Sequence, residues 1–402
     1  VPGYAIDPSE KTGKVAIVGA GPAGVTCAYH LARKGHSVTV FEGLGEPGGM
    51  SAMGIPDYRL PRDILRNEVE QIQAMGVTIH YNTSVGKDVK LSQLEEDYVA
   101  VFIGIGAQAA RHLRVPGEDG PGVISGIEFL QRRNEAPESL RGKRVLVFGG
   151  GNTAMDAARS ARRDGASVAV VYRRSEDEMP AARHEVEDAR AEGIEFRYLL
   201  APLEVVHEDN MLSYVEVQAM KLGIPDSDGR RRPEPLDGQT EHLPADLVIV
   251  AVAQAPDWFG MPEMLAKDAG RNLHDDGKLE DGVWAGGDDR GPNIAGAAIA
   301  QGRLAAEAAH AELRNLPLPE PESQAPVETK VVKHHWYKEE NRGDLPRRPV
   351  EEWLTDSEAE INLTIDEQRA LEEATRCMSC GLCFDCGQCF MYCNGAGFTR
   401  VE

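Results

Sequence analysis

Three glycines near the start of the chain have types and spacing that point to chemistry. Gly19, Gly21 and Gly24 form a G-x-G-x-x-G pattern within the stretch KVAIVGAGPAG. The first glycine of such a pattern allows a tight turn, the second lets the backbone approach a pyrophosphate, and the third lets a helix pack on a strand. The free N–H groups and the dipole at that helix N-terminus favour negative charge. The pattern therefore predicts a binding site for a dinucleotide.

An acidic residue completes this first unit. Glu42 stands 18 residues after Gly24, at the end of the predicted strand Ser37–Phe41. A carboxylate at that position can hold the hydroxyl pair of a ribose. Strand, helix, second strand and acidic tip follow one another in the required order. We therefore interpret residues 14–42 as a dinucleotide-binding unit and not as a glycine-rich turn without function.

The pattern recurs in the middle of the chain. Gly149, Gly151 and Ala154 give G-x-G-x-x-A directly after the predicted strand Arg144–Phe148. A second unit of this kind means either a second nucleotide or an idle relic of one. The retained glycines favour a second nucleotide.

The tip of the second unit is basic. Arg173 and Arg174 follow the predicted strand Ser167–Tyr172, at the place where the first unit has Glu42. Arginine at this position can pair with a ribose 2′-phosphate, which favours NADP over NAD. The acidic residues 176–178 close by would weaken a phosphate site. The residues themselves leave the choice between NAD and NADP open.

Six of the seven cysteines lie within residues 377–393, and this clustering indicates metal and a reducing compartment rather than a disulfide framework. Cys383, Cys386, Cys389 and Cys393 have the C-x2-C-x2-C-x3-C spacing of bacterial ferredoxins, although Asn394 follows where proline is usual. The spacing suits a [4Fe–4S] cluster, with zinc as the alternative for four thiolates. No second run follows, which leaves the occupancy of the cluster site open.

Composition limits the possible functions. The chain has 402 residues, enough for two or three domains, and a formal net charge of −22. This charge argues against nucleic acid as a partner, because phosphate binding needs a basic surface. No apolar run approaches the ~20 residues that span a bilayer, and no signal peptide is evident. We therefore expect a cytoplasmic protein without a membrane span.

The remaining pattern predicts one dinucleotide domain interrupted by another. Apolar strands alternate with helices on either side of the second unit, and a β excursion occupies residues 196–220, followed by a polar turn at 226–235. A long alanine-rich helix is predicted over Ala295–Leu313. Residues 315–348 read as an extended arm, and residues 363–375 as a helix with Thr364 as N-cap and Glu367 completing a capping box.

These residues together resemble a known family. The motifs GAGPAG, GIPDYRLP, RVPGED, GGGNTAMD, YRR, EMPA and AGGD stand in the order found in the NAD(P)H-oxidising iron–sulfur flavoprotein family of the glutamate synthase small subunit. The resemblance covers roughly residues 10–313. The cysteine run RCMSCGLCFDCGQCFMYC is more similar to the flavoproteins associated with dissimilatory sulfite reductase. The family's N-terminal domain with its own cysteine clusters is not in this sequence, so we expect a fragment or a processed form.

The resemblance implies an α/β fold of two Rossmann-like domains, with the NAD(P)H domain inserted in the FAD domain. The expected divisions are an FAD domain in two parts (1–112 and 258–314), an NAD(P)H domain (113–257), an extended arm with a helix (315–376) and a cysteine-rich, ferredoxin-like segment (377–402).

It also implies which residues bind each cofactor. For FAD these are Gly19, Gly21, Pro22, Ala23 and Gly24 at the pyrophosphate, Glu42 at the ribose, Gly49, Met50, Arg59 and Leu60 along the flavin, Asp288 at the ribityl chain or phosphate, and Ile294 to Ala297 at the pyrimidine edge. For NADP(H) or NAD(H) they are Gly149, Gly151, Asn152, Thr153, Arg173 and Arg174, with Gly287 and Asp288 near the nicotinamide.

The implied function is hydride exchange between NAD(P)H and FAD. Electrons would pass to or from iron–sulfur centres and a partner redox enzyme such as sulfite reductase. Because the cofactors carry this chemistry, we expect no catalytic side chain acting as general acid or base. The alternatives are the glutamate synthase small subunit itself and a non-catalytic electron-wiring subunit. A disulfide reductase is disfavoured, because Cys27 stands alone outside the C-terminal run.

Overall fold

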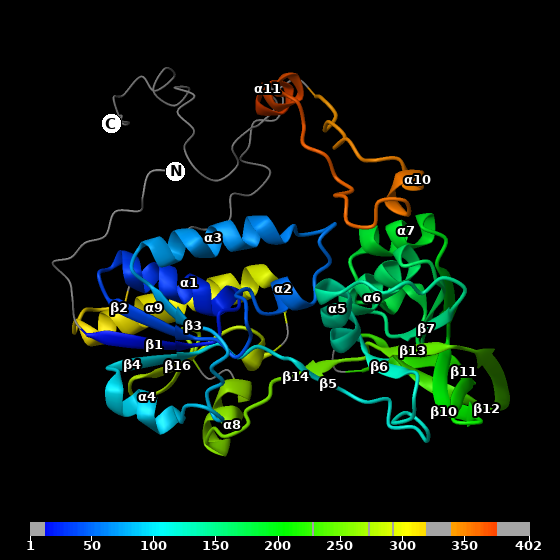
Figure 1. Ribbon diagram of the computed structural model, residues 1–402, viewed down its shortest axis with the longest axis horizontal. Helices are drawn as coiled ribbons and strands as arrows, with labels where there is room; N and C mark the ends of the chain where they lie inside the picture. Colours follow the sequence, from blue (N-terminus) through cyan, green and yellow to red (C-terminus); the bar gives the residue numbers. More distant parts are fainter. Residues whose placement is uncertain (1–12, 227–228, 272–273, 292, 319–338, 376–402) are drawn as a thin grey trace. The chain divides into compact units, whose positions relative to one another are not determined.

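The structure is a computed structural model that describes residues 13–226, 229–271, 274–291, 293–318 and 339–375 (Figure 1). The chain divides into two compact units. The first comprises Val1–Pro319 with Pro349–Ile361, and the second comprises Glu320–Arg348 with Asn362–Glu402. The two large sheets and the helices that cover them belong to the first unit.

A six-stranded sheet contains the first glycine pattern. Its order is β15-β16-β4-β1-β2-β3, with β15 antiparallel to β16 and the other neighbours parallel. In the central strand, Ile17 lies between Val40 and Phe102. Both faces are covered, so these strands read as apolar runs. The strands are β1 (Lys14–Val18), β2 (Ser37–Phe41), β3 (Thr78–His80), β4 (Ala100–Ile103), β15 (Lys278–Glu280) and β16 (Val283–Ala285).

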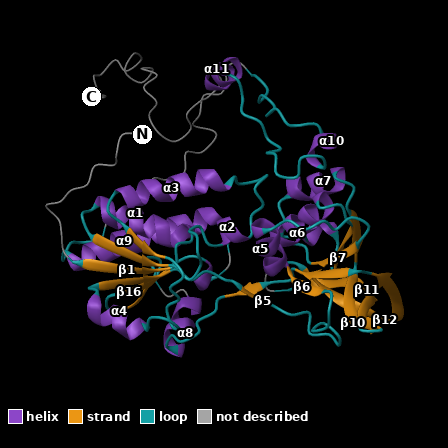
Figure 2. Ribbon diagram, viewed as in Figure 1, coloured by secondary structure: helices purple, strands orange, loops and turns teal. Residues whose placement is uncertain are grey.

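Helices cover both faces of this sheet (Figure 2). One face carries α1 (Pro22–Arg33), α3 (Arg62–Ala74) and α9 (Ala295–Leu313), and the other carries α4 (Leu91–Asp97) and α8 (Glu263–Arg271). Helices α1 and α9 pack very closely, since a Cβ on Gly302 would lie 2.2 Å from the carbonyl oxygen of Ala23. This contact explains why small residues dominate α9.

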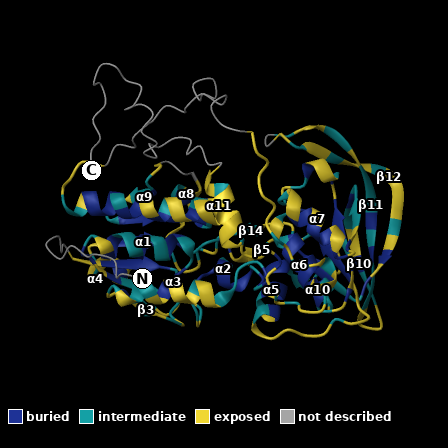
Figure 3. Ribbon diagram, turned by 90° about the horizontal axis from the view of Figure 1, so that it is seen from above, coloured by how far each residue is buried: buried dark blue, intermediate teal, exposed yellow. Residues whose placement is uncertain are grey.

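A five-stranded parallel sheet contains the second glycine pattern, in the order β6-β13-β7-β8-β9. Helices α5, α6 and α7 cover one face, and an antiparallel sheet of β10, β11 and β12 packs on the other. The elements are β6 (Val123–Ser125), β7 (Arg144–Phe148), β8 (Ser167–Tyr172), β9 (Glu195–Tyr198), β13 (Leu247–Val250), α5 (Gly126–Glu135), α6 (Asn152–Arg163), α7 (Arg183–Ala191), β10 (Leu200–Glu208), β11 (Met211–Pro225) and β12 (Arg231–Pro244). Figure 3 shows the inner faces of the helices buried and their outer faces exposed, together with much of the edge strand β12.

The second fold is inserted into the first, as the sequence predicts. Strands β4 and β16 are neighbours in the six-stranded sheet, although the whole five-stranded sheet lies between them in sequence. The chain leaves through β5 (Ala109–Ala110) and returns through β14 (Gln254–Ala255), and these two short strands pair antiparallel. The expected class of two Rossmann-like domains, one inside the other, is confirmed.

A segment beyond the two sheets also belongs to the first unit. In Pro349–Ile361, helix α10 (Val350–Trp353) precedes a turn, and Trp353 and Ile361 form a buried cluster with Tyr58. Tyr58 lies in the loop between α2 (Met50–Met53) and α3. The chain thus returns, far along the sequence, to cover an early loop.

Several predicted elements are confirmed with the same bounds, namely Ser37–Phe41, Arg144–Phe148, Ser167–Tyr172 and Ala295–Leu313. The short helices α2, α4, α7, α8 and α10 are not among the helices that the sequence predicts. Among the described residues, no helix has the length and apolar content that crossing a bilayer requires.

Two predictions were wrong in detail. The predicted turn at 226–235 ends at Arg230, and Arg231 already pairs with Pro225 in the β ladder. The prolines of β12 are tolerated because it is an edge strand. In the second unit, the helix predicted from residue 363 is α11 (Glu367–Thr375). Its first turn is capped by Asp366, whose Oδ1 accepts from the Arg369 amide at 2.8 Å, and not by Thr364.

The first glycine pattern provides a matched test of the packing. A Cβ on Gly24 would lie 1.9 Å from the Gly19 carbonyl oxygen, whereas one on Gly21 meets only the Gly49 Cα at 4.0 Å. In the apoprotein, we expect Gly24→Ala to lower the unfolding free energy by about 2–3 kcal/mol. Gly21→Ala should change it by less than about 0.5 kcal/mol. Urea unfolding followed by circular dichroism measures both values, and equal stabilities would contradict the packing role of Gly24.

Candidate functional site

Both glycine patterns open into one cavity of about 1700 Å³. Gly19, Gly21 and Glu42 line it on the side of the six-stranded sheet, and Gly149 and Gly151 line it on the side of the five-stranded sheet. In open parallel sheets, ligands bind beyond the carboxyl ends of the strands. Here the carboxyl ends of β1 and β7 face the same space.

The first pattern shapes a narrow turn between β1 and α1. Gly19 has a φ of +94°, and a Cβ there would lie 2.3 Å from the Gly104 carbonyl oxygen. Helix α1 has Gly21 at its N-cap and Pro22 in its first turn, with no side-chain cap. Because Gly21 has open space beside it, the backbone can be approached closely by a ligand. The geometry shows the tight turn at Gly19 and the close packing at Gly24, and it leaves open space beside Gly21.

Glu42 joins the end of β2 to this turn. Its Oε2 accepts from the Ala20 amide at 2.6 Å, and its Oε1 accepts from the Leu44 amide at 2.8 Å. The side chain is buried at the cavity wall, and burial raises the pKa of its carboxyl despite these hydrogen bonds. Each carboxylate oxygen can accept a second hydrogen bond. A ribose hydroxyl therefore remains a suitable partner for Glu42.

The second pattern repeats this geometry. Gly149 has a φ of +150°, and a Cβ there would lie 2.2 Å from the Ala251 carbonyl oxygen. Gly151 is the N-cap of α6, and a Cβ on it would meet only Pro180, at 4.0 Å. The next two side chains organise the rim. Asn152 Oδ1 accepts from the Ala182 amide at 2.9 Å, and Thr153 Oγ1 accepts from Gln254 Nε2 at 3.2 Å.

A third wall comes from the turn after β16. Gly287 has a φ of +104°, and its amide donates to Gln301 Oε1 at 2.7 Å. Asp288 Oδ1 accepts from the Asn293 amide at 3.0 Å, and burial raises the pKa of this carboxyl above its ordinary value. The two residues thereby line the cavity between the glycine patterns.

The structure brings most of the predicted cofactor residues to this cavity. Gly24, Leu60 and Ala297 do not line it. Gly24 instead packs α1 on β1. The predicted residues that do line the cavity are Gly19, Gly21, Pro22, Ala23, Glu42, Gly49, Met50, Arg59, Gly149, Gly151, Asn152, Thr153, Arg173, Arg174, Gly287, Asp288 and Ile294.

The predicted cluster ligands Cys383, Cys386, Cys389 and Cys393 lie outside the described residues. Within the described residues, Cys27 is the one cysteine. It is buried in α1, and burial raises the pKa of its thiol far above the ordinary value. A buried, protonated thiol is a poor nucleophile. This part of the chain therefore offers no reactive cysteine pair.

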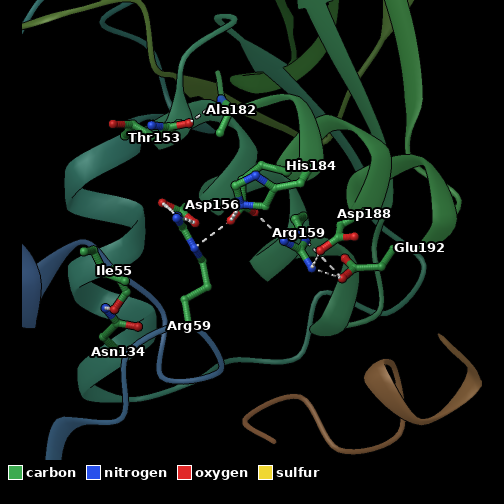
Figure 4. Close-up of polar contacts among 12 residues, drawn as sticks. Ile55, Arg59, Asn134, Thr153, Asp156, Arg159, Ala182, His184, Asp188 and Glu192 are labelled. Atoms are coloured by element: carbon green, nitrogen blue, oxygen red, sulfur yellow. Dashed lines mark hydrogen bonds and ion pairs between the residues drawn. The ribbon is translucent and has the colours of Figure 1, made fainter. Parts of the chain in front are cut away.

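Arg59 of the first fold forms a salt bridge with carboxylates of the second fold (Figure 4). Its Nη1 donates to both carboxylate oxygens of Asp156, at 2.6 and 2.8 Å, and its Nε lies 2.9 Å from Glu185 Oε1. Asp156 is on α6 and Glu185 on α7, whereas Arg59 precedes α3. The sequence predicted Arg59 as a flavin contact. The structure places its guanidinium in a salt bridge between the two folds.

This salt bridge belongs to a larger buried cluster. Arg159 Nη2 lies 2.9 Å from Glu192 Oε1, and Arg163 Nη2 lies at the same distance from that oxygen. The Tyr58 ring lies under the Arg163 guanidinium, 3.8 Å from ring centroid to Cζ. The cluster joins α6, α7 and the α2–α3 loop. Sequence reasoning missed Asp156 because its carboxylate read as an ordinary helix residue.

The residues around the cavity fit two dinucleotides. Gly21 and Gly151 each leave space that a Cβ would fill. Each is the N-cap of a helix whose first backbone N–H groups can donate hydrogen bonds to an anion. Glu42 stands at the tip of β2, and Arg173 at the tip of β8. The donor set suits FAD beside the six-stranded sheet and a nicotinamide nucleotide beside the five-stranded sheet.

Fold and site together define the class of FAD-dependent NAD(P)H oxidoreductases. A family model described as pyridine nucleotide-disulphide oxidoreductase matches residues 13–302. The chain belongs to this family.

Several curated proteins are similar to the chain. The beta subunit of NADP(+)-dependent formate dehydrogenase from Moorella thermoacetica is 43% identical over 387 residues, covering 91% of this chain and 54% of that protein. The beta subunit of NADPH-Fe(3+) oxidoreductase from Geobacter sulfurreducens is 38% identical, covering 92% and 62%. The glutamate synthase [NADPH] small chain of Escherichia coli is 38% identical, covering 74% and 68%. The chain thus spans a little over half the length of the first two.

Solved structures share the fold. FprA from Mycobacterium tuberculosis in complex with NADPH superimposes with a TM-score of 0.65 at 23% identity, covering 76% of this chain and 85% of that one. Thioredoxin reductase from T. acidophilum gives a TM-score of 0.57 at 20% identity, covering 75% and 99%.

Asp156 makes the stability of the fold depend on pH. Burial raises the pKa of this carboxyl to about 6 from an ordinary 3.8, although Arg59 opposes the shift. Between these two pKa values the folded chain retains a proton on Asp156 that the unfolded chain releases. The stability that this proton gives to the folded chain is present below pH ~4 and is lost as the pH rises through about 6. Relative to Asp156→Asn, the unfolding free energy of the wild type should fall by on the order of 3 kcal/mol between pH 4 and 7. Urea titrations at stepped pH measure this difference.

The control is Asp177→Asn, which removes an exposed carboxylate of the same region. Its unfolding free energy should follow the wild-type pH profile. Parallel profiles for the wild type and Asp156→Asn would contradict the role of Asp156.

Proposed function

We propose that the chain is an NAD(P)H:acceptor oxidoreductase whose electrons move between a nicotinamide nucleotide, FAD and the iron–sulfur centre of the C-terminal cysteine run. The single cavity shared by both glycine patterns carries this proposal. Hydride transfer requires the donor and acceptor rings to lie within contact distance. Two nucleotide folds that open into one space provide such an arrangement.

The residues contribute binding and orientation. FAD, when bound, supplies a ring that accepts hydride and releases electrons singly. Gly21 and Gly151 would let the two pyrophosphates approach the helix N-termini, and Glu42 would hold the adenosine ribose of FAD. Gln301 would keep the Gly287 amide in place beside Asp288. We assign no side chain as general acid or base.

The similar curated proteins support NADPH as the nucleotide. The names of all three specify NADP(+) or NADPH. Arg173 at the tip of β8 has the charge that a 2′-phosphate needs. We therefore propose that NADPH reacts faster than NADH.

The electron exit is the predicted [4Fe–4S] cluster of Cys383, Cys386, Cys389 and Cys393. The similar proteins are named as subunits or chains of larger enzymes, which supports a separate redox protein as the acceptor. The likeness of the cysteine run to flavoproteins associated with sulfite reductase makes that enzyme one candidate partner. Co-purification with a glutaminase subunit would instead favour the glutamate synthase small chain.

Anaerobic titration of the full chain tests the proposal. NADPH should bleach the visible flavin absorbance of the wild type, and dithionite should bleach any further absorbance of a cluster. Gly151→Ala should retain its flavin. NADPH should reduce that flavin about tenfold more slowly than in the wild type, because the new methyl group projects into the nucleotide side of the cavity. Gly21→Ala should lose flavin instead.

The matched control is Gly270→Ala, since a Cβ there meets no atom within 4 Å and Gly270 does not line the cavity. It should behave as the wild type does. A wild-type flavin that neither nucleotide bleaches would refute the enzyme and support a subunit that holds FAD for structure alone.

A further inference from the structure

Three arginines line the cavity where it reaches the end of β8. Arg173 and Arg174 follow that strand directly, and Arg230 comes from the turn between β11 and β12. Arg230 stands 57 residues after Arg173 in sequence, and the fold brings both to the wall of the one cavity. All three carry the positive charge that attracts a phosphate.

The Arg174 guanidinium forms hydrogen bonds with other residues of the chain. Its Nη2 donates to Asp226 Oδ2 at 2.7 Å, and its Nε donates to the Arg231 carbonyl oxygen at 2.8 Å. The side chain is only 4% exposed. Because its partners stand at the start of the turn and directly after Arg230, Arg174 holds the turn against the end of β8.

Asp226 fixes the same turn from within. While Oδ2 accepts from Arg174, Oδ1 accepts from the Arg230 amide at 3.2 Å. The Arg230 carbonyl oxygen in turn accepts from the Asp226 amide at 2.8 Å. One carboxylate thereby sets the position of the Arg230 backbone relative to β8.

The acidic residues 176–178 after β8 do not line the cavity. Glu176 Oε1 accepts from Arg190 Nη1 at 2.9 Å, and Glu178 Oε1 accepts from Arg231 Nε at 2.5 Å. Neither glutamate lines the cavity, and neither does Asp177. The charges of Glu176 and Glu178, which argued against a phosphate site in the sequence, are therefore paired with arginines that do not line the cavity.

We infer that Arg230 is a specificity-determining residue for the 2′-phosphate of NADP(H), binding it together with Arg173, and that Arg174 is a positioning residue for the turn. This inference rests on the proposed nucleotide site beside the five-stranded sheet. A guanidinium matches a phosphate through two parallel hydrogen bonds, and two guanidiniums from different elements enclose it from two sides. The basic tip predicted from the sequence is thus only half of the phosphate site.

Two probes separate the phosphate site from the rest of the nucleotide site. Adenosine 2′,5′-bisphosphate carries the 2′-phosphate, and 5′-AMP lacks it. Isothermal titration calorimetry of the full chain should show tighter binding of the bisphosphate. Arg230→Ala should weaken the bisphosphate about 10- to 100-fold, as expected for loss of a charge-assisted contact, and leave 5′-AMP unchanged.

Arg232→Ala is the matched control, because Arg232 is an exposed neighbour in β12 that does not line the cavity. It should bind both probes as the wild type does. Arg174→Ala should weaken the bisphosphate in the wild-type background but add little to Arg230→Ala, since it acts through that residue. A structural loss unrelated to Arg230 would instead weaken both probes.

The outcomes distinguish two kinds of failure. If the wild type binds both probes equally, or if Arg230→Ala weakens both alike or neither, the role of Arg230 is refuted while the nucleotide site stands. If the wild type binds neither probe, the proposed nucleotide site itself is refuted, and this inference with it.

Discussion

The salt bridge from Arg59 to Asp156 and Glu185 is the interaction on which the arrangement of the site depends. It joins the loop before α3 to the helices of the five-stranded sheet, while the chain connects the two folds only through β5 and β14. Both carboxylates are buried, and removing Arg59 would deprive Asp156 of its salt bridge while Glu185 would keep Arg159 as a partner. Because each fold supplies one wall of the cavity, this contact helps to set the relative position of the walls, together with the hydrogen bond that Asn134 Nδ2 donates to the Met53 carbonyl oxygen at 2.7 Å.

The surrounding cluster extends the same constraint. Arg159 and Arg163 both pair with Glu192 directly after α7, and both guanidinium groups lie over the Tyr58 ring. Trp353 from the returning segment packs beside them. A segment more than 290 residues from Tyr58 in sequence thus covers the loop that carries Arg59. The segment Pro349–Ile361 is therefore anchored at the junction of the two nucleotide folds.

The two halves of the site use one backbone design with different strand tips. In each, a glycine at positive φ approaches a neighbouring strand, and a second glycine leaves room at a helix N-terminus. The tips then differ in charge, with Glu42 suited to ribose hydroxyls and Arg173 to a phosphate. Membership of the pyridine nucleotide-disulphide oxidoreductase family fits this pair of folds. Within the described residues, Cys27 is the one cysteine, and it is buried in α1.

The sequence by itself determined the two mainly parallel sheets, the insertion of one fold in the other and the glycines that line the cavity from both folds. These features depend on local signals, since apolar runs mark buried strands and spaced glycines mark turns where no Cβ fits. The first residue of α11, the extent of β12 and the partners of Arg59 could not be read in this way. Asp156, Glu185 and Arg230 look like ordinary surface charges along the chain. Only the tertiary structure shows that Asp156 and Glu185 pair with Arg59 and that Arg230 lines the cavity, because burial and pairing depend on which distant elements meet.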